Sequence, residues 1–86
     1  MPKLLAIHEV DDVAHWLTSP KREEILAGIG TNITPYAPMD GSNLVAVSMD
    51  VEDMDALDAV LKSEAGAEAM KYDGVRAETM KMFMAG

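Results

Sequence analysis

His8 is the residue in this chain best suited to proton transfer. An imidazole has an unperturbed pKa of about 6.5, so it can act as a general base near neutral pH. His8 falls near the end of the first predicted strand, and the phase of an internal repeat places it on the sheet face that no helix covers. We expect a cavity there, with His8 as the catalytic candidate. A histidine that is simply hydrogen-bonded at an interface is the alternative.

His8 also begins a group of possible metal ligands with Glu9, Asp11, Asp12 and His15. Asp11 and His15 have the i, i+4 spacing that puts two ligands on one helical face. However, His8 and Glu9 are consecutive strand residues and point to opposite faces, and the two aspartates are explained as helix caps. We therefore predict no metal site, and the sequence indicates no cofactor.

Three further side chains are candidates for ligand binding: Tyr36, Ser48 and Phe83. Tyr36 lies on a predicted edge strand, and Tyr36 or Ser48 would orient a substrate. Phe83 would present an aromatic surface on the uncovered sheet face. Trp16, by contrast, follows the apolar stripe of a predicted helix and is expected in the core.

The elements that must position these residues are predicted from an internal repeat, in which the second half of the chain resembles the first at a spacing of about 44 residues. Each half is predicted to contain a strand, a helix in two short pieces and a second strand. The helices are expected to begin after Asp11 or Asp12 and after Asp53, and to restart at Ser19 and Ser63. The predicted strands are 3–10, 31–37, 44–51 and 75–84.

The order βαββαβ predicts one ferredoxin-like α+β domain over residues 1–86. Two split βαβ units give a four-stranded antiparallel sheet of order 4-1-3-2 with both helices on one face. A large apolar surface on the other face is typical of an interface, so we predict a two-fold homodimer that packs sheet to sheet. The predicted uncovered face carries Leu4, Ala6, His8, Leu44, Ala46, Ser48, Thr79, Lys81 and Phe83.

Composition limits the partners. The 86 residues carry 15 Asp and Glu against 7 Lys and Arg, a formal net charge of −8. Such an acidic protein cannot form the basic stripe that phosphate backbones need, so we expect neither nucleic acid nor an anionic membrane as a partner. The absence of cysteine excludes disulfides, thiolate metal sites and cysteine nucleophiles. No apolar run approaches the length of a membrane span and no signal peptide is evident, so a cytoplasmic location is expected.

The whole chain resembles the dimeric α+β barrel superfamily, in particular short uncharacterised bacterial members. The resemblance rests on the βαββαβ order and on three segments: 8–12 leading into Trp16 and Leu17, 40–43 at the hairpin, and 73–75 before the last strand. It implies dimerisation through the sheets. Members include cofactor-free oxygenases of polyketide aromatics, haem-degrading enzymes, lactone isomerases and ligand-sensing domains. Two of these branches use an Asn and a Trp near the cavity, but those roles do not carry over to Trp16.

Three functional hypotheses follow. The first is a homodimer that binds a small apolar or aromatic ligand in a cavity between sheet and helices. The second is a cofactor-independent monooxygenase or isomerase that uses His8 as base. The third is a non-catalytic dimerisation or sensing module with a fully packed interface. The sequence leaves open whether the protein is an enzyme.

Overall fold

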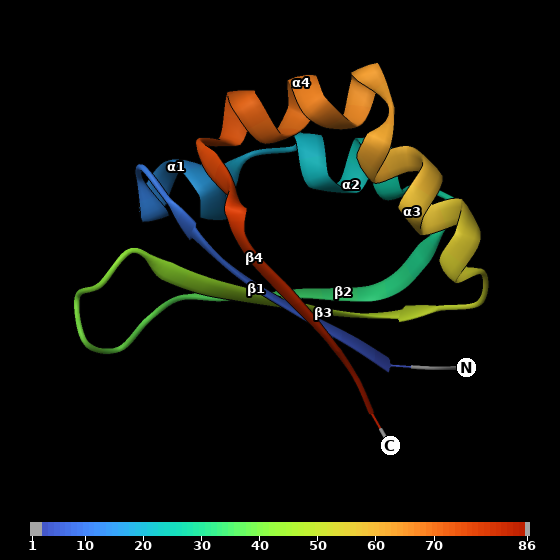
Figure 1. The fold of residues 1–86 in the computed structure, drawn as a ribbon. Helices are drawn as coiled ribbons and strands as arrows, with labels where there is room; N and C mark the ends of the chain where they lie inside the picture. Colours follow the sequence, from blue (N-terminus) through green and yellow to red (C-terminus); the bar gives the residue numbers. More distant parts are fainter. Residues whose placement is uncertain (1–2, 86) are drawn as a thin grey trace.

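A computed structural model describes residues 3–85 (Figure 1). It contains four strands and four helical segments, and the chain runs strand, two helices, two strands, two helices, strand. The elements are β1 (Lys3–Val10), α1 (Val13–Thr18), α2 (Lys21–Leu26), β2 (Gly30–Tyr36), β3 (Leu44–Val51), α3 (Met54–Lys62), α4 (Glu64–Asp73) and β4 (Val75–Met84).

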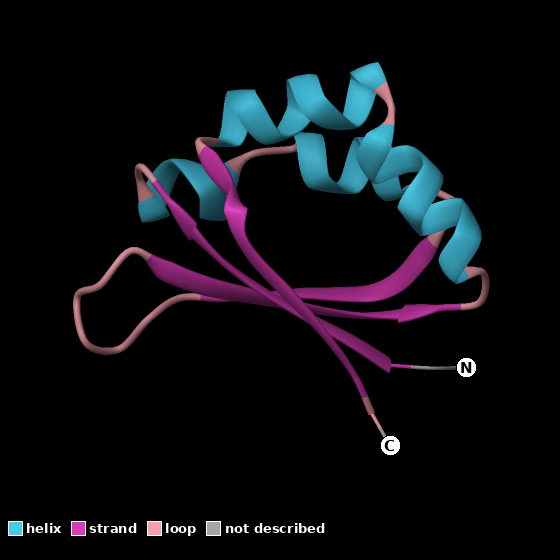
Figure 2. Ribbon diagram, viewed as in Figure 1, coloured by secondary structure: helices cyan, strands magenta, loops and turns pink. Residues whose placement is uncertain are grey.

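The four strands form one antiparallel sheet in the order β2-β3-β1-β4, and all the helices lie on one of its faces (Figure 2). The predicted ferredoxin-like fold, including its strand order and the edge position of β2, is confirmed. Pro35 lacks the N–H that a central strand must donate, which suits an edge strand.

Local capping residues set the helix boundaries. The Asp12 side chain accepts a hydrogen bond from the N–H of His15 at the start of α1, and Asp53 does the same for two N–H groups of α3. The Ser63 hydroxyl accepts from the N–H of Gly66 and starts α4. Gly74 follows α4 with a left-handed φ of 71°, a conformation that glycine adopts without strain.

The core lies between the sheet and the helices, and it places His8 differently from the prediction. Leu4, Ala6 and His8 point toward the helices and are buried, alongside inward-facing residues of β3 such as Val45 and Val47. The prediction that these three β1 residues lie on the uncovered face is therefore wrong.

The cause is that the first helical segments of the two halves differ in length by an odd number of residues. The caps Asp12 and Asp53 are 41 residues apart, whereas Ser19 and Ser63 are 44 apart. The three additional residues lie in the first helical segment, because α1 has six residues and α3 has nine. Since strand side chains alternate with period two, carrying the 44-residue spacing back to β1 reverses its faces.

The other members of the predicted uncovered face agree better with the structure. Leu44, Ala46, Ser48, Lys81 and Phe83 occupy outward-facing register positions, where their β1 partners are Leu5, Ile7 and Glu9. The register of β1 and β4 shifts between Ile7 and Glu9, where the Glu9 N–H donates to the Thr79 hydroxyl. Within residues 3–85, the helices are too short or too polar to cross a membrane.

Candidate functional site

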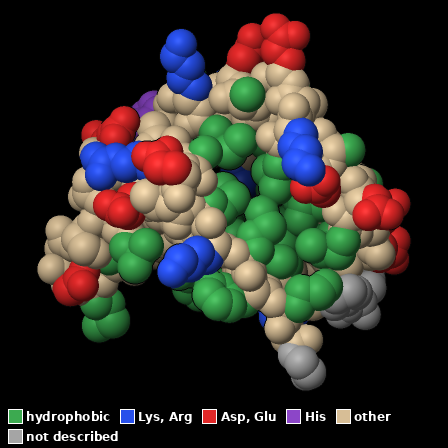
Figure 3. All heavy atoms as spheres, viewed as in Figure 1, with side chains coloured by type: hydrophobic (Ala, Val, Ile, Leu, Met, Phe, Trp, Pro, Cys, Tyr) green, Lys and Arg blue, Asp and Glu red, His purple; other side chains and the backbone are tan. Residues whose placement is uncertain are grey.

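A cavity lies between the sheet and the helices. Sixteen of the described residues line it, and thirteen of them are apolar. Hydrophobic side chains surround a hollow on the face shown in Figure 3. The cavity volume is about 70 Å³. It is well below the roughly 300 Å³ at which ligand pockets usually begin.

His8 projects into this cavity from β1. Its side chain is only 4% exposed, and its Nδ1 atom is buried without a hydrogen-bond partner among the described residues. The imidazole meets the Trp16 ring edge to face, with 5.6 Å between centroids and planes at 80°. Burial, which disfavours the charged form, is the main reason why the pKa of His8 is lowered from its ordinary value. The imidazole is therefore neutral at pH 7.

Arg22 reaches the same cavity from α2. Its guanidinium carbon lies 4.7 Å from the centroid of the Trp16 ring, and Nη1 donates to the Trp16 carbonyl oxygen at 3.4 Å. The Nε atom is buried and has no acceptor among residues 3–85. Burial also lowers the pKa of Arg22, and the negative charge of Asp73 opposes that effect. Trp16, which is 2% exposed, thus fixes two polar residues as well as belonging to the core.

Asp73 supplies a carboxylate at the end of α4. It is 5% exposed and lines the cavity, and its Oδ1 atom has no hydrogen-bond donor in the described part of the chain. It takes part in none of the ion pairs found among residues 3–85. A buried carboxylate of this kind is unusual, because burying a charge is costly unless it is paired.

Sequence reasoning missed Arg22 and Asp73. Neither residue is among the candidates that the sequence suggests, and residues 73–75 are considered there only as the segment before the last strand. Helical spacing offered a signal, since Asp73 is three and four residues beyond Met70 and Ala69, which face inward. A charged residue in phase with an apolar stripe is the pattern that would have identified it.

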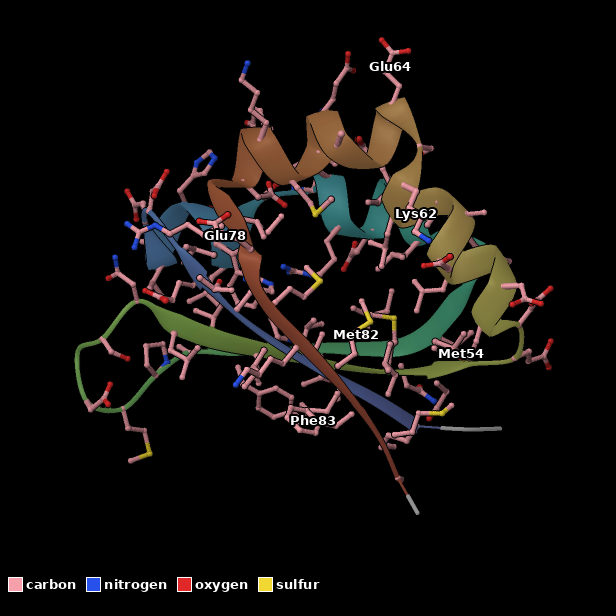
Figure 4. The ribbon with its side chains drawn as sticks, viewed as in Figure 1. Met54, Lys62, Glu64, Glu78, Met82 and Phe83 are labelled. Atoms are coloured by element: carbon pink, nitrogen blue, oxygen red, sulfur yellow. The ribbon has the colours of Figure 1, made fainter. Side chains whose placement is uncertain are left out.

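Methionines form a flexible part of the cavity wall: Met49, Met70, Met80 and Met82. Met82 points into the space between sheet and helices, whereas Phe83 points to the other side of the sheet (Figure 4). Thioether side chains adapt their shape readily, so this wall can change shape around an occupant larger than the cavity volume of about 70 Å³.

The structure does not bring the predicted ligand-binding residues together with His8. Tyr36 and Ser48 lie on the outer face of the sheet, where their hydroxyl oxygens are 3.0 Å apart in a hydrogen bond. Phe83, which is 50% exposed, shares that face on the edge strand β4, two strands away from Ser48 on β3 and three strands away from Tyr36 on β2. The three residues therefore form part of a broad surface rather than one site in a single chain.

The possible metal cluster does not form. Within the described residues, no group of three or more His, Asp or Glu side chains is arranged to hold a metal ion. Asp12 caps α1, while Glu9 and Asp11 pair with Arg76 at 3.4 and 3.0 Å. The Nε2 atom of His15 lies 2.8 Å from the Tyr72 carbonyl oxygen, away from His8.

The fold and the cavity define a ferredoxin-like α+β protein with an apolar site under its helices. Neither a model of a known protein family nor a curated protein sequence matches the chain. Solved structures do match. A candidate antibiotic biosynthesis monooxygenase from Bordetella bronchiseptica has a TM-score of 0.70 and 13% identity, covering 99% of this chain and 94% of that one.

Two other solved structures have the same arrangement. A candidate antibiotic biosynthesis monooxygenase from Nitrosomonas europaea has a TM-score of 0.67 and 13% identity, over 100% of this chain and 97% of that one. A protein of the ethyl tert-butyl ether d (ethd) family from Bacillus halodurans has a TM-score of 0.59 and 18% identity, with coverage of 100% and 97%. At such low identities, these similarities establish the fold alone.

Proposed function

We propose that this protein binds a small apolar or aromatic molecule in the cavity between its sheet and its helices. The observation that carries the proposal is the composition of the cavity wall: thirteen apolar residues together with three polar ones. Convergent polar groups in an apolar pocket are the usual form of a small-molecule site. The four methionines supply the adaptability that the small cavity volume requires.

Trp16 gives a direct test because it is the only tryptophan in the chain and lines the cavity. Toluene is a suitable first probe, and its binding is expected to change the Trp16 emission. Ala6→Leu adds bulk to the cavity wall and should abolish this change. Ala77→Leu makes the same substitution at an exposed position of β4 and should not. Equal responses of the two variants would contradict the proposed location.

Catalysis by His8 is the second candidate function. Two structural neighbours are named antibiotic biosynthesis monooxygenases, and His8 presents to the cavity a buried imidazole whose Nδ1 has no hydrogen-bond partner among residues 3–85. A neutral imidazole can accept a proton from a bound substrate, which is the first step of cofactor-independent oxygenation or isomerisation. Oxygen uptake with hydroquinone as probe tests this role. We expect His8→Gln to abolish protein-dependent uptake and the exposed His15→Gln to preserve it; no uptake above buffer would contradict it.

We further propose that the outer face of the sheet joins two copies of the chain. Leu5, Tyr36, Leu44 and Phe83 are all exposed on this face. An isologous sheet-to-sheet contact would bury them on both copies at once. Light scattering after size exclusion should report a dimer, and Phe83→Glu should yield a monomer. Ala67→Glu, on an exposed part of α4, is the control; a monomeric unmodified protein would refute the proposal.

A further inference from the structure

Three buried polar atoms at the cavity have no hydrogen-bond partner in residues 3–85. They are Nδ1 of His8, Nε of Arg22 and Oδ1 of Asp73, and they come from β1, α2 and α4. A buried polar group without a partner has lost its hydrogen bonds to water and gained none in return, which lowers stability. Three such atoms around one cavity are more than packing alone explains, so this group, the polar triad, defines what an occupant must offer.

The charges of the polar triad cancel. Arg22 contributes one positive charge and Asp73 one negative charge, and His8 is neutral because burial lowers its pKa. Both charged groups also act on His8, so the three lie within electrostatic reach of one another. The rest of the wall is apolar. A charged occupant would therefore leave an uncompensated charge in an apolar site, which is strongly unfavourable.

The hydrogen-bonding capacity of the polar triad is more specific than its charge. The Nε–H of Arg22 can only donate, and the ionised carboxylate of Asp73 can only accept. An occupant that satisfies both must therefore accept one hydrogen bond and donate another. A hydroxyl group does both with a single oxygen atom.

Arg22 is already held in place for this role. Its guanidinium carbon lies 4.7 Å from the Trp16 ring centroid, and its Nη1 bonds the Trp16 carbonyl oxygen. These contacts use the terminal part of the guanidinium and leave Nε for an occupant. A donor that is fixed before binding loses little conformational entropy when an occupant arrives.

We propose that the cavity selects an uncharged molecule with a hydroxyl group on a small apolar body. The hydroxyl donates to Asp73 and accepts from Arg22, and His8 is its third polar neighbour. This inference rests on the proposed function, since it specifies the class of molecule that the cavity binds. Arg22 and Asp73 are then the residues that determine specificity.

Four probes of similar size separate the contributions of charge and hydrogen bonding. Benzyl alcohol, benzoate, benzylammonium and toluene share one ring and one additional carbon but differ in charge and polarity. Trp16 emission reports the binding of each. Benzyl alcohol is expected to bind at least about tenfold more tightly than either ion, because the ions leave a net charge in the cavity. It should also bind more tightly than toluene, which leaves the polar triad unpaired.

Two variants should reverse the preference in opposite directions. Asp73→Asn leaves the cavity with a net positive charge, so benzoate should become the preferred probe. Arg22→Gln leaves it with a net negative charge and should favour benzylammonium. Asp58→Asn and Lys21→Gln make the same changes in net charge at positions outside the cavity lining, and they should keep the original order.

The outcomes distinguish this inference from the proposed function. If toluene binds as tightly as benzyl alcohol, or if Asp73→Asn leaves the order of probes unchanged, the selection of a hydroxyl is wrong but a ligand cavity remains. If none of the four probes changes Trp16 emission, both the selection and the ligand cavity are refuted. Should Arg22→Gln fail to fold after losing its contacts with Trp16, Asp73→Asn decides the question alone.

Discussion

Acidification should destabilise the protein through His8. The pKa of His8 is lowered in the folded state, mainly by burial, while the unfolded chain keeps the ordinary value of 6.5. Below pH 6.5 the unfolded state therefore binds a proton that the folded state does not. The stability that His8 contributes is fully present above pH 6.5 and is lost as the pH falls toward the folded-state pKa. The slope for one proton is at most about 1.4 kcal/mol per pH unit.

Urea unfolding at pH 7.5, 6.5 and 5.5 measures this effect. We expect the free energy of unfolding to fall between pH 6.5 and 5.5 and to change little above pH 7. In His8→Gln, which has no titratable side chain at this position, the fall should be smaller. Comparing the two proteins removes the contribution of the carboxylates that lie away from His8. His15→Gln alters an exposed histidine and should keep the fall.

Burial is the largest of the effects on the pKa of His8. The Glu9 backbone and Asp73 favour a charged His8 and Arg22 disfavours it, but each of these effects on the pKa is smaller than that of burial. If His8→Gln lost as much stability as the unmodified protein between pH 6.5 and 5.5, His8 would be free to take up a proton in the folded state. The assignment of a neutral, desolvated imidazole to the cavity would then be refuted.

Two further predictions concern the helices that cover the cavity. A Cβ atom at Gly66 would overlap the Val60 carbonyl oxygen, so Gly66→Ala should lower the free energy of unfolding by about 2–3 kcal/mol in urea titrations, and a neutral result would refute this close approach. Asp53 accepts from two N–H groups of α3, so Asp53→Ala should cost about 1 kcal/mol in the same assay. The exposed Asp58→Ala is the control, and an equal loss there would contradict a capping role for Asp53.

The order and approximate limits of the elements could be predicted because their signals are local. Asp12, Asp53 and Ser63 each bond an N–H within three residues, so their effect can be seen in a short stretch of sequence. The predicted start of the second helix at Ser19 agrees less closely with the structure. Helix α2 begins at Lys21, Pro20 occupies the cap position, and the Ser19 hydroxyl accepts from the Lys21 N–H at 3.2 Å.

The face of β1 could not be predicted in the same way. Leu4 and Ala6 are apolar, but so are Leu5 and Ile7 on the other face, so alternation alone does not choose between them. The internal repeat chose the wrong face because the two halves differ by three residues in their first helix. Aligning the caps Asp12 and Asp53 instead would have matched Val10 with Val51, which are both fully buried.

The candidate site depends on contacts between elements that are distant in sequence. His8, Arg22 and Asp73 come from three elements and meet only when the helices pack on the sheet. Sequence spacing therefore identified His8 as a residue of interest but could not provide its neighbours. It also grouped His8 with Tyr36 and Ser48, which share the opposite face.

The polar triad lowers the free energy of unfolding, and in a chain this short that loss is a large part of the total. A chain of 86 residues has a small core, and folded domains are stable by only about 5–15 kcal/mol. Three unsatisfied atoms at about 1–3 kcal/mol each are a large part of that margin. Apolar side chains at the same positions would remove the cost, since replacing buried charges by well-packed hydrophobic residues is often stabilising. Buried polar groups that lower stability are expected where binding, rather than packing, determines the residues.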